Sequence, residues 1–352
     1  AYLMDWRDSG VPRALAAVQA AGVRAEAAFQ PLTARTADGD VALARGSISI
    51  PVSTQRLTPD SLYTVVRRAA EDANVPVWSA VTGKAVEGID LGSGDFRPVR
   101  APRTLFPMGD GVSSYEAGQL WHLLDQRIGL PVTKVDVTDL GRADWADYDV
   151  LVLVSGSTAA FTGARLDALK TWVRSGGTLI TQRSATAWAA RNGFTPNIEP
   201  PGVGQPASEA EPEGMETPRR DYADARDFAG AQAIGGSIWQ ADLDLTHPLG
   251  FGYTHRALPI WRDHSLFFAP SKNPYSTVAR LVDDDPLLSG YISPVNRERL
   301  RGSPSVLVDR LGGGTVVLFV DNTNYRGYWR GTNRLFLNAL FFGDHIQVPA
   351  SP

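Results

Sequence analysis

The chain has 352 residues, 43% of them hydrophobic and 20% charged, which is enough apolar material for two globular domains. Its formal net charge of −4 gives no electrostatic basis for binding nucleic acid, because phosphate contacts require a basic surface. The lack of cysteine excludes disulfides, thiolate zinc ligands and a cysteine nucleophile. No apolar stretch is long enough to predict a membrane-spanning helix.

Residues 1–96 alternate short apolar segments with two helical ones. The sequence opens directly on a strand, with no initiator methionine or signal peptide, so we expect a piece cut from a longer precursor. Thr58 and Pro59 are typical of a helix N-cap and a first helical position. The pattern predicts a small βαββαβ domain, with helices near 11–21 and 58–73 and strands near 2–4, 23–29, 47–52 and 75–81.

Residues 97–346 are expected to form a second domain, entered through a link at 83–103 that is rich in Gly, Pro and Arg. The continuous apolar run 150–154 is typical of a strand covered on both faces. Its neighbours alternate with helices and predict an α/β domain with a doubly wound, mostly parallel sheet of the flavodoxin type and right-handed crossovers. The strands of this sheet are expected near 104–108, 132–137, 150–154 and 178–181.

Three later segments complete the predicted domain. Residues 196–227 are rich in Pro, Gly and Glu and predict a surface excursion. Residues 305–320 hold two apolar strands around a triple glycine, which predicts a hairpin at one edge of the sheet. Residues 333–342 predict a closing helix that Gly343 ends.

The turn at Gln182-Arg183-Ser184 joins a buried strand to an alanine-rich helix, which is where many α/β hydrolytic folds place a nucleophile. A class I glutamine amidotransferase-like domain has this order of elements, with a cysteine at the turn. Ser184 is the one candidate nucleophile here, and it requires an adjacent base. The alternative is that Ser184 caps the helix and Arg183 makes a structural ion pair, which is the reading we favour. We therefore predict no catalytic residue in this chain. Ser184 is kept as the one weak candidate.

The loop Gly109-Asp110-Gly111 lies between a predicted strand and helix, and Asp136 ends the next strand. This resembles half of a dinucleotide-binding fingerprint, but Ser114 replaces the third glycine. The alternative is an ordinary turn of a parallel sheet. We keep the three loop residues as candidate ligand contacts, together with Ser155 at the end of the 150–154 strand and Arg183.

The loop 322–330 (NTNYRGYWR) follows an apolar strand and combines aromatic residues with arginines. Open α/β sheets place ligands at this end of their strands. Asn322, Arg326, Trp329 and Arg330 are therefore candidate contacts for a carboxylate or a sugar. Docking on another domain is the alternative that we favour, since Trp and Arg are enriched at interfaces.

A metal site is not predicted. The histidines His247, His255 and His264 lie near several aspartates, but neither an HxxE nor an HExxH pair occurs. We expect no cofactor in this chain.

Three stretches resemble the C-terminal region of large bacterial M14-type zinc carboxypeptidase-like proteins: 109–136 (GDGVSSYEAGQLWHLLDQRIGLPVTKVD), 245–253 (LTHPLGFGY) and 312–343 (GGGTVVLFVDNTNYRGYWRGTNRLFLNALFFG). In that family a zinc carboxypeptidase domain precedes a small α/β segment and a glutamine amidotransferase-like domain. The family's zinc ligands have no counterpart here. The resemblance therefore implies an accessory region, from Ala1 to about Ile346, whose peptidase domain is absent.

The same resemblance implies further expectations. The zinc would belong to the missing peptidase domain, which would also be the partner, and the protein would be periplasmic or secreted. A peptide or small ligand is a further candidate partner, whereas nucleic acid and a membrane span are not expected. The resulting hypotheses are a non-catalytic accessory region, a hydrolase that uses Ser184, and a small-ligand or glycan-binding module that uses the 322–330 loop.

Overall fold

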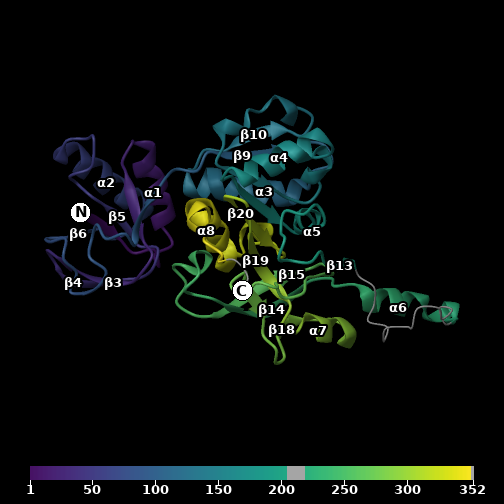
Figure 1. Cartoon of the computed structure of the whole chain (residues 1–352). Helices are drawn as coiled ribbons and strands as arrows, with labels where there is room; N and C mark the ends of the chain where they lie inside the picture. Colours follow the sequence, from purple (N-terminus) through teal and green to yellow (C-terminus); the bar gives the residue numbers. More distant parts are fainter. Residues whose placement is uncertain (204–218, 350–352) are drawn as a thin grey trace.

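The computed structural model describes residues 1–203 and 219–349, and Figure 1 shows them as two units joined near residue 100. Most of the predicted Pro- and Glu-rich excursion, residues 204–218, lies outside the described residues. Its described flanks contain β13 (Gly202–Val203) and α6 (Ala225–Gln232). None of the helices in the described ranges is long and apolar enough to cross a membrane.

The N-terminal unit has the predicted βαββαβ order. Its elements are β1 (Tyr2–Met4), α1 (Val11–Ala20), β2 (Ala25–Ala28), β5 (Ile48–Ile50), α2 (Pro59–Ala73) and β6 (Trp78–Ser79). The strands form an antiparallel sheet in the order β6-β1-β5-β2, which is the ferredoxin-like arrangement, and β8 (Phe96–Val99) extends it beyond β2. The Thr58 side chain accepts a hydrogen bond from Ser61 N at 3.3 Å and so caps α2, as predicted.

A small second sheet in this unit was not predicted. It contains β4 (Gly39–Leu43), β3 (Leu32–Thr36) and β7 (Glu87–Gly88), in that order. Leu32, Ala34 and Leu43 pack with Leu3 and Phe96 in a separate small core. Such short strands, with few apolar residues, carry too weak an alternation to be recognised from sequence alone.

The large sheet has ten strands and is parallel in one half. The parallel strands lie in the order β10 (Thr133–Asp136), β9 (Thr104–Met108), β11 (Val150–Leu153), β12 (Thr178–Gln182) and β20 (Gly314–Phe319). In chain order this is 2-1-3-4-5, the doubly wound flavodoxin arrangement. The predicted fold class, α/β with a flavodoxin or glutamine amidotransferase-like sheet, is therefore confirmed.

The other half of the sheet is antiparallel. It continues through β19 (Pro304–Leu311), β17 (Thr277–Leu281), β14 (Ser237–Leu243) and β15 (Ala257–Arg262), with β18 (Leu287–Gly290) also paired to β14. The predicted hairpin is present as β19 and β20, but its placement at an edge is wrong, because β20 lies between β12 and β19. Both faces of β19 are largely buried, as expected for a central strand.

Helices cover both faces of the parallel half. Apolar residues of α3 (Ser114–His122) and α8 (Asn333–Phe342) share one core with Val150 and Val152 of β11. Residues of α4 (Ala164–Arg174) and α5 (Ser184–Arg191) share the opposite core with Leu151 and Leu153. The alternation along β11 thus assigns successive side chains to opposite layers. The remaining elements are β16 (Leu266–Phe267), which pairs with β13, and α7 (Pro294–Leu300).

The two units share an apolar core, as Figure 1 suggests from the position of α8 between them. Trp6 lies 5.0 Å from Phe342, and Phe29 lies 5.4 Å from Phe251, measured between ring centroids. Asn338 of α8 accepts a hydrogen bond from the Trp6 indole N–H at 2.8 Å. The loops of the large sheet are therefore carried on a continuous packed framework.

Candidate functional site

Arg183 occupies the turn between β12 and α5. Its backbone has φ 54° and ψ −123°, a conformation that residues other than glycine rarely adopt. Arg183 N donates to Phe319 O of β20 at 2.9 Å, which ties the turn to the neighbouring strand. The strained strand-to-helix turn expected of a nucleophile elbow is thus present, with an arginine at its apex.

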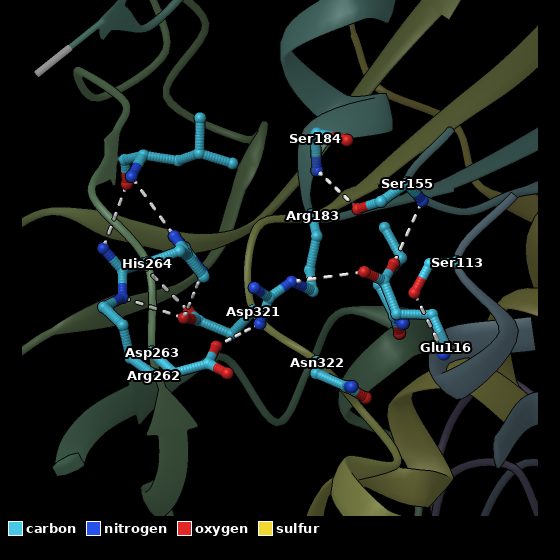
Figure 2. A network of polar contacts seen from close by, with 12 residues as sticks. Ser113, Glu116, Ser155, Arg183, Ser184, Arg262, Asp263, His264, Asp321 and Asn322 are labelled. Carbon is cyan, nitrogen blue, oxygen red and sulfur yellow. Dashed lines mark hydrogen bonds and ion pairs between the residues drawn. The ribbon is translucent and has the colours of Figure 1, made fainter. Parts of the chain in front are cut away.

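Two carboxylates hold the Arg183 side chain, as Figure 2 shows. Its guanidinium contacts Asp263, which follows β15, and lies 3.4 Å from Glu116 Oε1 on α3. Glu116 is nearly buried, and its other oxygen accepts a hydrogen bond from Ser155 N at 3.0 Å. The side chain of Arg183 is itself only 20% exposed. This cluster therefore links four segments at the carboxyl edge of the sheet and pairs the guanidinium at the turn with two carboxylates.

Ser184 is exposed beside the turn, and its backbone N–H donates to Ser155 Oγ at 3.4 Å. Within residues 1–203 and 219–349, no histidine or carboxylate makes a hydrogen bond with the Ser184 hydroxyl. A serine nucleophile needs such a base to accept its proton. Arg183 is ion-paired, as in the alternative we favoured, but Ser184 does not cap α5: Arg183 occupies the N-cap position, and no side chain caps the helix.

A second polar cluster surrounds Asp321, directly after β20. Arg262 contacts both carboxylate oxygens of Asp321, at 2.8 and 3.0 Å, and Ser305 Oγ donates to it at 2.6 Å. His264 Nε2 lies 3.2 Å from the same carboxylate. The Arg262 side chain is fully buried, and that of Asp321 is 6% exposed. Figure 2 places this cluster next to Asp263.

Charge pairing fixes the protonation of this second cluster. Burial raises the pKa of Asp321, but Arg262 and His264 outweigh that effect and hold it well below its usual value. Burial, aided by Arg262, lowers the pKa of His264 although Asp321 opposes the shift. His264 Nδ1 accepts from Leu266 N, so the neutral ring presents its Nε2 hydrogen toward Asp321. The cluster holds one ion pair and a neutral imidazole and is suited to positioning loops.

The Gly109–Gly111 loop lies at the switch point between β9 and β11, where doubly wound sheets bind ligands. The loops after β9 and β11 are joined to each other here, because Ser113 N donates to Ser155 O at 2.8 Å. A Cβ at Gly156 would lie 1.9 Å from Gly111 O, so the two loops are in backbone contact. Asp136 accepts two hydrogen bonds from Thr138, at 2.9 and 2.6 Å, and so stabilises its own turn. These contacts give the Gly109–Gly111 loop and Asp136 structural partners, and a ligand at the loop stays a prediction.

The 322–330 loop is anchored at its start. Asn322 Nδ2 donates to Gln119 Oε1 of α3 at 2.7 Å, and Thr323 donates twice to Gln182 Oε1, at 3.2 and 3.0 Å. Arg326 is exposed and has φ 52°, while Trp329 is half-buried. The structure thus places Ser155 and Arg183 together, with Gly111 beside them. Asn322 is buried and lies near the same cluster in Figure 2, whereas Arg326 is exposed beside α3.

Several polar residues of these clusters were not predicted. Glu116 stands three residues after Ser113, whose side chain caps α3, and this spacing is typical of a capping box. Arg262 ends β15, a strand that was not assigned from the sequence, and Asp263 follows it. Asp321 directly follows the apolar run that contains β20. An acid at the end of such a run is the sequence feature that could have indicated a functional or structural role for it.

The histidines near residues 247–264 do not converge. Among the described residues, no group of three or more His, Asp or Glu side chains could hold a metal ion. His247 is instead the N-cap of a short helix, η6 (Pro248–Gly250), and its Nδ1 accepts from Leu249 N at 3.1 Å. Its Nε2 is buried without a hydrogen-bond partner among those residues.

This setting predicts a loss of stability in weak acid. Burial lowers the pKa of His247 from 6.5 to about 4, so the unfolded chain binds the proton more tightly. As the pH falls from 6.5 toward 4, His247 should remove up to about 3 kcal/mol from the free energy of unfolding. The measurement is urea denaturation at several pH values. His247→Asn keeps an acceptor for Leu249 N but does not titrate, so equal pH dependence of the two proteins would contradict the assignment.

No family model and no curated protein matches the sequence. Among solved structures, a putative ThuA-like protein from Parabacteroides merdae is similar over 71% of this chain and 94% of its own, with 12% identity and a TM-score of 0.44. Another from Bacteroides uniformis is similar over 68% and 89%, with 12% identity and a TM-score of 0.40. Gan42B, a GH42 β-galactosidase of G. stearothermophilus, is similar over 80% of this chain and 33% of its own, with 12% identity and a TM-score of 0.35.

These findings correct the identification with M14 zinc carboxypeptidase-like proteins, which is wrong. The similar structures are ThuA-like proteins and glycosidases, and nothing among them indicates a carboxypeptidase parent. In the stretches that suggested the family, close backbone packing requires some of the glycines. Gly314, for example, must lack a side chain because a Cβ there would lie 2.0 Å from Val173 O. The expected zinc, peptidase partner and secreted location depended on that resemblance and lose its support.

Proposed function

We propose that this chain is a non-catalytic recognition module, in which an amidotransferase-like sheet holds binding loops at its carboxyl edge. The observation that supports this most strongly is Arg183 at the apex of the elbow turn, between Glu116 and Asp263. A nucleophile at this position must be free to attack, whereas a guanidinium cannot attack and this one is ion-paired. The turn geometry is therefore used for a contact between loops.

The surrounding contacts support the same proposal. The loops after β9, β11 and β20 are joined to one another or to α3 by hydrogen bonds that close the switch point. A site for chemistry requires room for a substrate beside the reacting groups. Here Glu116 and Ser155 contact the turn itself, which supports recognition at the surfaces around the cluster.

The alternative, a hydrolase that uses Ser184, can be tested directly. Incubation with a fluorophosphonate probe, which labels activated serines, should give no labelling above that of Ser184→Ala. Hydrolysis of p-nitrophenyl esters and of glutamine should likewise equal the rate with the variant. Labelling or turnover that disappears in Ser184→Ala, while urea denaturation shows both proteins folded, would overturn the proposal.

A further inference from the structure

An open hollow of about 660 Å³ lies between α3 and the turn η7 (Tyr325–Gly327). It is lined chiefly by Tyr115, Gln119, His122, Arg326 and Tyr328. Its volume is within the range of small-molecule sites. None of these residues belongs to the cluster of Glu116, Arg183 and Asp263, so the hollow does not depend on the proposed absence of catalysis.

Two tyrosine rings are exposed in this hollow. Tyr115 is 82% exposed and Tyr328 is 59% exposed, which is unusual for large side chains that could pack elsewhere. Tyr325, which precedes Arg326 in the same turn, stacks on Trp261 at a centroid distance of 4.4 Å and so helps to fix that turn. Rigid aromatic rings with polar ends offer large contact areas to a ligand at low cost in conformational entropy.

The polar groups of the hollow are mainly hydrogen-bond donors. No aspartate or glutamate lines it, and Arg326 makes no salt bridge with any described residue. The Arg326 guanidinium instead lies 5.2 Å from the Tyr325 ring centroid. Gln119 Oε1 is already occupied by Asn322, which leaves its amide N–H groups for another partner.

The surroundings reinforce this positive character. Burial lowers the pKa of Arg127, which follows α3, and the nearby charge of Arg330 lowers it further. Arg330 also follows the turn that carries Arg326 within a few residues and adds positive charge to this segment. Arg326 itself is held at φ 52°, where a non-glycine residue is strained. A cation presented in this way, with no acidic partner, complements an anionic ligand.

We propose that this hollow binds a sugar that carries a carboxylate, with the carboxylate at Arg326 and the pyranose ring against Tyr115 and Tyr328. A guanidinium can contact both oxygens of a carboxylate. Gln119 and His122 would meet the ring hydroxyls, and the tyrosine rings would cover its apolar face. Acidic sugars combine these features in one small ligand, whereas a neutral sugar leaves the arginine unpaired.

The test is calorimetric titration with trigalacturonate, with galactotriose as the neutral match and benzoate as a carboxylate without a sugar ring. Trigalacturonate should bind at least tenfold more tightly than either, and its affinity should fall as salt is added. Arg326→Gly should weaken it at least tenfold while leaving the melting temperature equal or higher, because glycine accepts the left-handed backbone. Tyr115→Ala and Tyr328→Ala should weaken it similarly.

Tyr222→Ala is the matched control, since Tyr222 is 94% exposed and does not line the hollow. The proposal is overturned if trigalacturonate does not bind, if Arg326→Gly binds it unchanged, or if benzoate or galactotriose binds equally well. Analysis of the products separates the two proposals. Cleavage that requires Ser184 would overturn the non-catalytic role while the binding site stood.

Discussion

Replacing Asp321 with alanine should lower the free energy of unfolding by about 3–5 kcal/mol, since removal of one partner leaves a buried charge unpaired. Arg262 would lose both of its contacts with the carboxylate, at 2.8 and 3.0 Å, while its side chain is fully buried. Ser305 would lose its acceptor, and His264 would lose the carboxylate that lies 3.2 Å from its Nε2. Urea denaturation of the purified proteins measures the effect.

The pair of Arg256 and Asp242 provides a matched control. It has the same chemistry, with two contacts of 2.7 Å, but the Arg256 side chain is 60% exposed. Asp242→Ala should cost no more than about 1 kcal/mol, because water screens exposed ion pairs. If Asp321→Ala costs no more than Asp242→Ala, the buried cluster is not a stabilising centre. Removing both charges, in Arg262→Met/Asp321→Leu, should restore part of the loss, since no unpaired ion remains.

The pH dependence of this pair has a defined sign. The pKa of Asp321 lies below that of an unfolded aspartate, so the native carboxylate stays ionised where the unfolded one takes up a proton. Its contribution should be complete above about pH 4 and decline below that value. Asp321→Asn should therefore flatten the stability curve in acid, in contrast with His247→Asn, which acts between pH 4 and 6.5.

The parallel half of the fold was predictable because its signals are local. The apolar run of β11 and the helices between strands can each be read from a short window, and right-handed crossovers then determine the topology. The antiparallel half was not predictable in the same way. Strands β14, β15 and β17 alternate within short segments, and their pairing depends on partners far along the chain. As a result the hairpin of β19 and β20 was placed at an edge when it is central.

The candidate site, like the fold, could be predicted from the sequence only in part. The elbow turn could be located from the strand and helix around it, and an ion pair for Arg183 was a stated expectation. Its partners could not be identified, since Glu116 and Asp263 lie 67 and 80 residues away, on elements whose positions were unknown. The hollow beside α3 was still less accessible to sequence reasoning. The 322–330 loop was recognised, but nothing in its sequence indicates that Arg326 and Tyr328 meet Tyr115 and Gln119 of α3.

Replacing Asn338 with leucine should lower the free energy of unfolding by at least about 3 kcal/mol and loosen the contact between the two units. Asn338 is fully buried in α8, and its amide N–H groups donate to Leu249 O and Phe251 O at 2.7 and 2.9 Å. Its oxygen accepts the indole N–H of Trp6 at 2.8 Å. Leucine has a similar volume, so the main loss is that three buried polar groups have no partner, at about 1–3 kcal/mol each.

The contact between the two units can be followed separately by amide hydrogen exchange. In Asn338→Leu, amide hydrogen exchange should quicken in α1 and β1 more than in β11 and β12, because Trp6 no longer anchors the N-terminal unit to α8. Asn296 offers a control, since it is buried and its amide also donates to two carbonyls, Ala231 O and Gln232 O, but at α7. Asn296→Leu should destabilise the protein without changing exchange in α1.

A double-mutant cycle with Trp6→Phe isolates the hydrogen bond that joins the units. If the bond matters, the two substitutions together should cost less than the sum of their separate costs, because Phe leaves no indole N–H to satisfy. Additive costs would show that Asn338 acts only within the large sheet, through Leu249 and Phe251. In that case the aromatic contacts of Trp6 and Phe29, together with the hydrogen bonds from Arg334 to Trp6 O and Asp8 O, would hold the N-terminal unit against α8.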